Sequence, residues 1–245
     1  MSAITMLGVL FLHSFGSTPI EFKEFGEYLQ EQGFKTTIPL LPGHGTHPDD
    51  LKRFTFEDWV KSGEKALLSL DCQGTFIIGE ITGAPLAIIL ASTHPEVLGI
   101  VTLSGLINLP RWITIIDPLI QIRSNVLSLA TNANPFVDYS RSLWQKVKIY
   151  ERVPHKSLRE VYALIKKSKK LLGEVHQPIF VLQSTTAKEI TKKNAHAIFE
   201  GVSSRKKKLM FLEKGGALMS IDEGRHIVFR EVTNFLWSCV DLYQI

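Results

Sequence analysis

The sequence predicts an α/β fold with a mainly parallel, doubly wound sheet and an inserted helical cap. Short, nearly continuous apolar runs alternate with longer amphipathic segments, as in parallel strands that are covered on both faces. Between residues 106 and 173 the alternation stops, and this segment is too long for a plain crossover. We therefore expect a core of residues 1–105 and 174–245, with a cap of residues 106–173 over the carboxyl edge of the sheet, where open α/β folds bind ligands.

Six short runs are predicted to be strands, because each has an apolar or β-branched centre between polar or turn-forming residues. The runs are Met6–His13, Lys35–Pro39, Thr75–Gly79, Gly99–Leu103, Ile179–Gln183 and Leu209–Leu212. Amphipathic spacing predicts helices between them. These helices are Ile20–Glu31, Phe56–Leu70, Ala84–Ser92, Asn194–Phe199 and Asp222–Leu242. Within the cap, the segment "SLREVYALIKKSKKLL" also has a helical pattern.

Composition indicates an ordinary globular domain. The 245 residues are 44% hydrophobic and 21% charged, with a formal net charge of +4. The basic residues concentrate in Lys166–Lys170 and Arg205–Lys208, which we interpret as a solvated helix face and a solvated loop. Because no aromatic residues are interleaved with these lysines, the sequence does not predict a nucleic-acid partner.

The N-terminus and the cysteines indicate the cellular compartment of the protein. The apolar run near the N-terminus predicts a first strand rather than a signal peptide. No apolar run approaches the ~20 residues that a membrane-spanning helix needs. Cys72 and Cys239 have no CxxC pattern, so unpaired thiols in a reducing compartment are expected. We expect a cytoplasmic protein without a membrane span, a cofactor or a metal site.

A specific motif lies at Gly79-Glu80-Ile81-Thr82-Gly83, between a predicted strand and a predicted helix. Its glycines have the spacing of the G-x-S-x-G turn, which presents the nucleophilic serine of a large class of hydrolases. Here isoleucine stands at the serine position. A β-branched residue in the strained conformation of such a turn must either relax the turn or be held there by packing.

Several segments in the same order make the chain resemble the bacterial carboxylesterases and monoacylglycerol lipases of the α/β-hydrolase superfamily. They are "GVLFLHSFGSTPIEF", "IPLLPGHGTHPDDL", "FIIGEITGAPLAIILAS", "YERVPHKSLREVYALIKKSKKLL", "QPIFVLQS" and "LMFLEKGGALMSIDEGR". The resemblance covers almost the whole chain and implies the α/β-hydrolase fold. It also implies a Ser–Asp–His triad for ester hydrolysis.

The resemblance maps the triad onto three hydrocarbon side chains. The nucleophile falls on Ile81, the acid on or beside Ala187, and the histidine on Ala217. None of these side chains attacks a carbonyl or moves a proton, so a degenerate triad without catalytic residues is expected. A two-residue shift would place Glu189 at the acid position. The neighbouring hydroxyl residues from Ser184 to Thr186 offer no carboxylate.

Two backbone donors are expected to remain in the pocket. The resemblance places the oxyanion-binding N–H groups at Phe15 and Thr82, where they would bind a carbonyl or carboxylate oxygen. His13 and Glu80 are further candidates for contact with a ligand. His44 and His47 also follow a predicted strand, at the same edge of the sheet.

Two classes of function follow. The first is a non-catalytic member of the family that binds a small apolar or acyl ligand under the cap, or a protein partner. The alternative is a carboxylic-ester hydrolase or another enzyme that uses non-triad residues of the same pocket, such as Thr82, Glu80 or His13.

Overall fold

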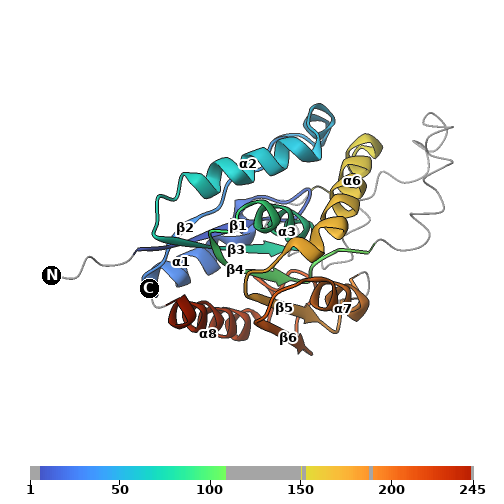
Figure 1. Cartoon of the computed structure of the whole chain (residues 1–245). Helices are drawn as coiled ribbons and strands as arrows, with labels where there is room; N and C mark the ends of the chain where they lie inside the picture. Colours follow the sequence, from blue (N-terminus) through green and yellow to red (C-terminus); the bar gives the residue numbers. More distant parts are fainter. Residues whose placement is uncertain (1–5, 109–149, 151–152, 188–189, 244–245) are drawn as a thin grey trace.

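A computed structural model describes residues 6–108, 150, 153–187 and 190–243, and its centre is a six-stranded, all-parallel sheet (Figure 1). The strands are β1 (Leu7–Leu12), β2 (Lys35–Thr37), β3 (Gly74–Glu80), β4 (Val97–Leu103), β5 (Ile179–Ser184) and β6 (Lys207–Leu212). Their order across the sheet is β2-β1-β3-β4-β5-β6. Every predicted strand overlaps one of them, so the predicted doubly wound sheet is confirmed.

Helices flank this sheet at the predicted places. They are η1 (Pro19–Phe22), α1 (Lys23–Glu31), η2 (Pro48–Arg53), α2 (Phe56–Leu68), α3 (Gly83–Thr93), α6 (His155–Leu171), η4 (Leu172–Glu174), α7 (Lys192–Gly201) and α8 (Arg225–Tyr243). The prediction that the last helix begins at Asp222 is wrong. The Asp222 carbonyl accepts from Arg225 N and its carboxylate accepts from Gly216 N, so Asp222 belongs to a turn before the helix.

Two hydrophobic cores lie on opposite faces of the sheet. Helices α1 and α8 cover one face, where Phe25 stacks on Phe229 with ring centroids 4.2 Å apart. Helices α2, α3, α6 and α7 cover the other face (Figure 1). Successive residues of β1, such as Leu10 and Phe11, therefore enter different cores. This double coverage explains why the strands are apolar runs instead of alternating patterns.

The second basic run is not the solvated loop that the sequence predicts. Lys207 and Lys208 lie in β6, at the edge of the sheet. Lys207 Nζ donates to the carbonyls of Phe199 and Val202, at 3.0 and 2.8 Å, and Lys208 Nζ lies 2.9 Å from a carboxylate oxygen of Glu231. Charged side chains of this kind protect a sheet edge from pairing with another strand.

Most of the predicted cap, residues 109–149 and 151–152, lies outside the described residues. Its last helix, α6, packs against α2 and α3. Where the chain leaves the core after β4, Asn194 Oδ1 accepts from the N–H groups of Ile107 and Asn108 at 2.9 and 2.7 Å. In the described part of the chain, no helix combines the length and the apolarity that crossing a membrane requires.

Candidate functional site

The turn between β3 and α3 forms the centre of the candidate site. Ile81 lies alone in the left-handed region of backbone conformation on this turn, with φ of 50°. Its N–H donates to the Leu103 carbonyl at 2.9 Å, and its carbonyl accepts from Leu106 N at 3.0 Å. These two bonds fix the turn to the end of β4 and the residues that follow. The sequence motif thus folds as the strand, sharp turn and helix that it predicts.

Both glycines of the motif are required by close backbone approaches. A Cβ atom on Gly79 would overlap the carbonyl of Gly83, and a Cβ atom on Gly83 would overlap the carbonyl of Leu12. The second approach presses the first turn of α3 against the end of β1. It therefore brings Thr82 next to the loop that follows β1, which contains Phe15.

Ile81 is held in the turn by packing. Its side chain is 4% exposed and belongs to the core under α2, α3, α6 and α7. Positive φ at a β-branched residue costs about 1–3 kcal/mol. Burying an isoleucine side chain contributes about 1.5–3 kcal/mol, which offsets that cost. Of the two outcomes that the sequence allowed, relaxation of the turn or retention by packing, the structure has the second.

Ala187 and Ala217 join Ile81 in the same hydrophobic core. They lie in the loops that follow β5 and β6, and both are buried. The carboxyl ends of parallel strands meet at one edge of the sheet, so three loops far apart in sequence converge there. Glu189, the alternative acid, lies outside the described residues.

Hydroxyl groups join the loop after β5 to the loop after β6. Ser184 Oγ donates to the Gly215 carbonyl at 2.8 Å, and Thr186 Oγ1 donates to the same oxygen. Both interactions are between neutral groups. The hydrogen bonds that join these loops among the described residues are thus made by hydroxyl groups to a backbone carbonyl.

One of the two expected backbone donors is already occupied. Phe15 N donates to Thr82 Oγ1 at 2.5 Å, and both residues are buried. The sequence predicted that the Phe15 and Thr82 N–H groups would both be open to a ligand. For Phe15 the structure differs, because its N–H group already donates to the Thr82 hydroxyl.

The histidines near this edge have structural partners. His13 is fully buried, its Nδ1 donates to the Ser14 carbonyl at 2.9 Å, and its Nε2 accepts from Leu41 N at 3.1 Å. Burial lowers the pKa of His13 to about 4, against a smaller opposite effect of the Ser14 hydrogen bond. Burial, followed by the neighbouring His13 ring, lowers the pKa of His44 to about 3. Both rings are therefore neutral near pH 7.

His47 is exposed instead of approaching the pocket. Its Nδ1 accepts from Asp49 N at 3.2 Å and so caps the short helix η2. The sequence signal for this role is the Pro48 that follows it, since proline is favoured in the first turn of a helix.

Glu80 does not have a free carboxyl group either. Its carboxyl oxygens accept from the N–H of Ser220 at 3.0 Å and bond to the Ser220 hydroxyl. Glu21 approaches it from η1, and the two carboxyl groups share a hydrogen bond. Glu21 in turn accepts from Ser14 N at 3.1 Å and from Ser14 Oγ at 2.9 Å. We therefore leave His13 and Glu80 out of the ligand-contacting set.

Burial dominates the electrostatics of this acid pair, because both residues are 0% exposed. Burial raises the pKa of Glu21 to about 7. Burial, and next the Glu21 carboxyl, raises the pKa of Glu80 well above its ordinary value. Sequence reasoning missed Glu21, and the only signal for it is a carboxylate between the apolar residues Ile20 and Phe22.

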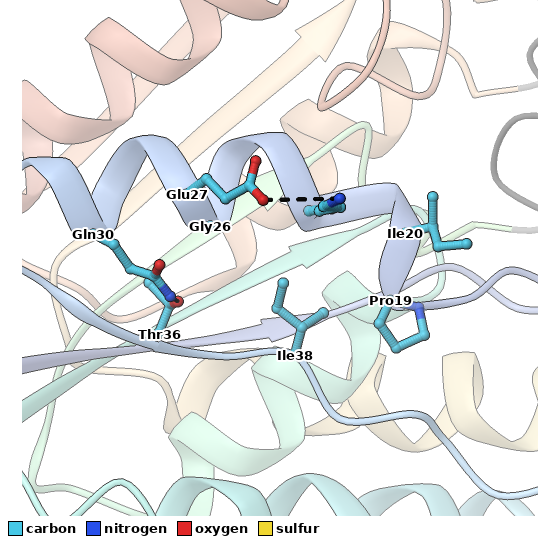
Figure 2. Close-up of a pocket in the computed structure, with 8 residues that line it drawn as sticks. Pro19, Ile20, Gly26, Glu27, Gln30, Thr36 and Ile38 are labelled. Atoms are coloured by element: carbon cyan, nitrogen blue, oxygen red, sulfur yellow. Dashed lines mark hydrogen bonds and ion pairs between the residues drawn. The ribbon is translucent and has the colours of Figure 1, made fainter.

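An open groove of about 440 Å³ lies elsewhere, between η1, α1 and the edge strand β2 (Figure 2). Its floor includes Ile38, and Lys23 and Glu27 form an ion pair on its rim. None of the residues predicted for the functional site lines it.

Comparison with known proteins relates the chain to lipolytic enzymes. No protein-family model matches the sequence. A thermostable monoacylglycerol lipase of a Bacillus species is 28% identical over 238 residues, which are 94% of this chain and 90% of the lipase. A carboxylesterase of Bacillus subtilis is 28% identical over 232 residues, which are 93% of this chain and 91% of the esterase.

Solved structures agree on the fold. One, described with the metagenome-derived lipolytic enzymes LipS and LipT, has a TM-score of 0.81 at 21% identity and covers 96% of this chain and 94% of its own. The monoacylglycerol lipase of Paleococcus ferrophilus has a TM-score of 0.76 at 17% identity and covers 95% of this chain and 94% of its own. The described sheet and helices therefore form the α/β-hydrolase fold.

Proposed function

We propose that this chain, an α/β-hydrolase-fold relative of carboxylesterases and monoacylglycerol lipases, is a non-catalytic member of that group that binds a small apolar or acyl ligand. The observation that carries the proposal is Ile81, a hydrocarbon side chain on the turn where the G-x-S-x-G motif has its serine. Ala187 and Ala217, which the resemblance aligns with the acid and the histidine, are hydrocarbon as well.

The alternative of an enzyme with other residues has weaker support. The Thr82 hydroxyl accepts from Phe15 N, and its described hydrogen bonds include none to a base. Activation of a hydroxyl nucleophile needs a base within hydrogen-bond reach. His13, a candidate base, has both ring nitrogens bonded to the backbone.

An apolar or acyl ligand is proposed because Ile81, Ala187 and Ala217, which the resemblance aligns with the triad, are apolar, and because the relatives act on lipids or carboxylic esters according to their names. We place this ligand under the proposed cap of residues 106–173. A protein partner bound at the same edge is the second form of the proposal.

Ester hydrolysis tests the loss of catalysis. Purified native protein is compared with Ile81→Ser and with the triple variant Ile81→Ser/Ala187→Asp/Ala217→His, using short p-nitrophenyl esters and a monoacylglycerol. We expect no turnover by the native protein, because removal of triad members takes away most of a ~10⁶-fold effect. Turnover by the native protein above the uncatalysed rate would overturn the proposal.

Thermal unfolding tests ligand binding. A ligand that binds only the folded state stabilises it by about 2.7 kcal/mol at one hundred times its Kd. We expect a fatty acid or a monoacylglycerol to raise the Tm, and sugars of similar size to leave it unchanged. If no acyl or apolar compound raises the Tm, the ligand-binding form is rejected in favour of the protein partner.

A further inference from the structure

One face of η1 and α1 borders the open groove beside β2 (Figure 2). The residues of this face follow one another at intervals of three or four, as neighbours on a helix surface do, and they are Ile20, Lys23, Glu27 and Gln30. Ile20 is 38% exposed, and Ile38 lines the groove from the side of the strand. The groove therefore combines apolar side chains with one positive and one negative charge on its rim.

The groove lies along the less protected edge of the sheet. Among the described strands β2 pairs with β1 alone, so its other side is a free edge. At the opposite edge, the lysines of β6 protect the strand against pairing with another chain. In β2 the only charged residue is Lys35, and its Nζ donates to the Leu70 carbonyl at 2.6 Å. Of the two edges, the one beside the groove is therefore the more open to a partner.

The charges on the rim are complementary to those of a second copy of the same face. Lys23 and Glu27 are 71% and 61% exposed, and the 3.9 Å ion pair between them contributes little within one chain. A two-fold axis sets one α1 antiparallel to the other and places residue i against residue j, and j against i. With the axis at the level of Phe25, halfway between the two charges, Lys23 of each copy faces Glu27 of the partner subunit.

From this pattern we infer that the groove beside β2 is an interface between two copies of this chain, with their α1 helices antiparallel and Lys23 paired with Glu27 across the two-fold axis. Association would remove the apolar side chains of Ile20 and Ile38 from water, which favours binding. The ion pairs would fix the orientation of the two copies. The inference is independent of the proposed function, because no residue predicted for the functional site lines the groove.

Sedimentation velocity over a dilution series tests the interface. We expect native protein to form a dimer that dissociates on dilution. Lys23→Glu leaves only carboxylates at the crossing and Glu27→Lys leaves only ammonium groups, so each should raise the Kd of the dimer roughly tenfold or more. Lys52→Glu makes the same change of charge at an exposed position of η2, so this matched control should keep the native Kd.

An equimolar mixture of Lys23→Glu and Glu27→Lys separates contact between copies from contact within one copy. In the mixed dimer every carboxylate at the crossing faces an ammonium group, so the mixture should regain the native Kd although neither variant does so alone. Native protein that stays monomeric at every concentration would overturn the inference. A native dimer that neither variant weakens would overturn it as well, and so would a mixture that associates no better than its components.

Hydrogen exchange locates the interface without any substitution. In native protein, backbone amides of α1 and β2 should exchange more slowly at a concentration where the dimer forms than after dilution. The amides of β6, at the opposite edge of the sheet, should exchange at the same rate in both samples. If the slower exchange appears at β6 and not at α1 and β2, the copies associate through another surface and the inference fails.

Discussion

At the scale of single residues, Ile81 combines an unfavourable backbone conformation with favourable burial of its side chain. Its φ of 50° is a conformation in which a β-branched residue is rare, yet its side chain is buried in the larger apolar core. In the G-x-S-x-G motif, this turn exposes the hydroxyl of a serine. In this chain, the same turn directs the hydrocarbon side chain of Ile81 into the apolar core.

At position 81, the glycine variant should be at least as stable as the alanine variant, which is the reverse of the usual order. Ile81→Ala removes the buried side chain and keeps the strain, with an expected loss of about 2–4 kcal/mol in the free energy of unfolding. Ile81→Gly loses the same packing and relieves the strain, so it should be at least as stable as Ile81→Ala. Urea unfolding measures both.

Ile77 gives the control for this order. It is a buried residue of β3 in the same core, with regular strand backbone. At this position, the free energy of unfolding of Ile77→Gly should be lower than that of Ile77→Ala by about 0.5–1 kcal/mol. A larger loss for Ile81→Gly than for Ile81→Ala would show that the turn is not strained in solution.

At the scale of elements, the Glu21–Glu80 pair links three loops at the edge of the sheet. Glu80 ends β3, Glu21 lies in η1 and bonds to Ser14 after β1, and Ser220 lies in the loop after β6. The other groups that bond directly to the pair are serine hydroxyls and amides, and His13 nearby is neutral. Among the described contacts, no cation compensates the charge of the pair, so it needs a bound proton to stay buried.

This pair should make the protein less stable at alkaline pH. A carboxyl group whose pKa is raised by folding binds more protons in the native state, so the free energy of unfolding falls as pH rises from 4.5 towards the raised pKa. Each such proton contributes a slope of about 1.4 kcal/mol per pH unit. Below pH 6.5 the depressed pKa values of His13 and His44 give the opposite slope, so the carboxyl contribution is isolated by comparing native protein with a variant that keeps both histidines.

Glu80→Gln isolates this slope, because the amide keeps a hydrogen-bond donor towards Glu21 at every pH. We expect the variant to lose less stability than native protein as pH rises from 4.5 through 7, as measured by urea unfolding at each pH. Glu31→Gln, at an exposed position on α1, should follow the native curve. Parallel curves for native protein and Glu80→Gln would exclude the shared proton.

At the scale of the whole molecule, hydrogen bonds from described residues of the proposed cap join it to the core. Asn194 in α7 accepts from the N–H groups of Ile107 and Asn108, where the chain leaves the core. On the return, Tyr150 N donates to the Gly16 carbonyl at 2.8 Å, and the Tyr150 hydroxyl accepts from Thr46 N at 2.8 Å. The first connection therefore ends on helix α7, and the second ends on the loops that contain Gly16 and Thr46.

Removal of the Asn194 side chain should weaken this connection. Asn194 is buried, so Asn194→Ala leaves two backbone N–H groups without their acceptor and should lower the free energy of unfolding by about 1–3 kcal/mol. Asn194→Asp keeps an acceptor oxygen and should recover most of the loss. Equal destabilisation by both variants would mean that the acceptor is not what stabilises this connection.

The sequence by itself determined the fold and the turn. Parallel strands covered on both faces must be apolar along their whole length, and that requirement is visible as local runs in one dimension. The spacing of Gly79 and Gly83 predicts the sharp turn for a similar reason, because Gly79 approaches the Gly83 carbonyl only four residues further along the chain.

Only the tertiary structure decided which polar groups remain available to a ligand. The bond from Phe15 to Thr82, the carboxyl pair of Glu21 and Glu80, and the bond from Ser220 to Glu80 join segments that are separate in sequence. No local pattern encodes these pairs, because each depends on how neighbouring strands bring their loops together at one edge. Whether a donor is open or occupied is therefore a property of the folded chain.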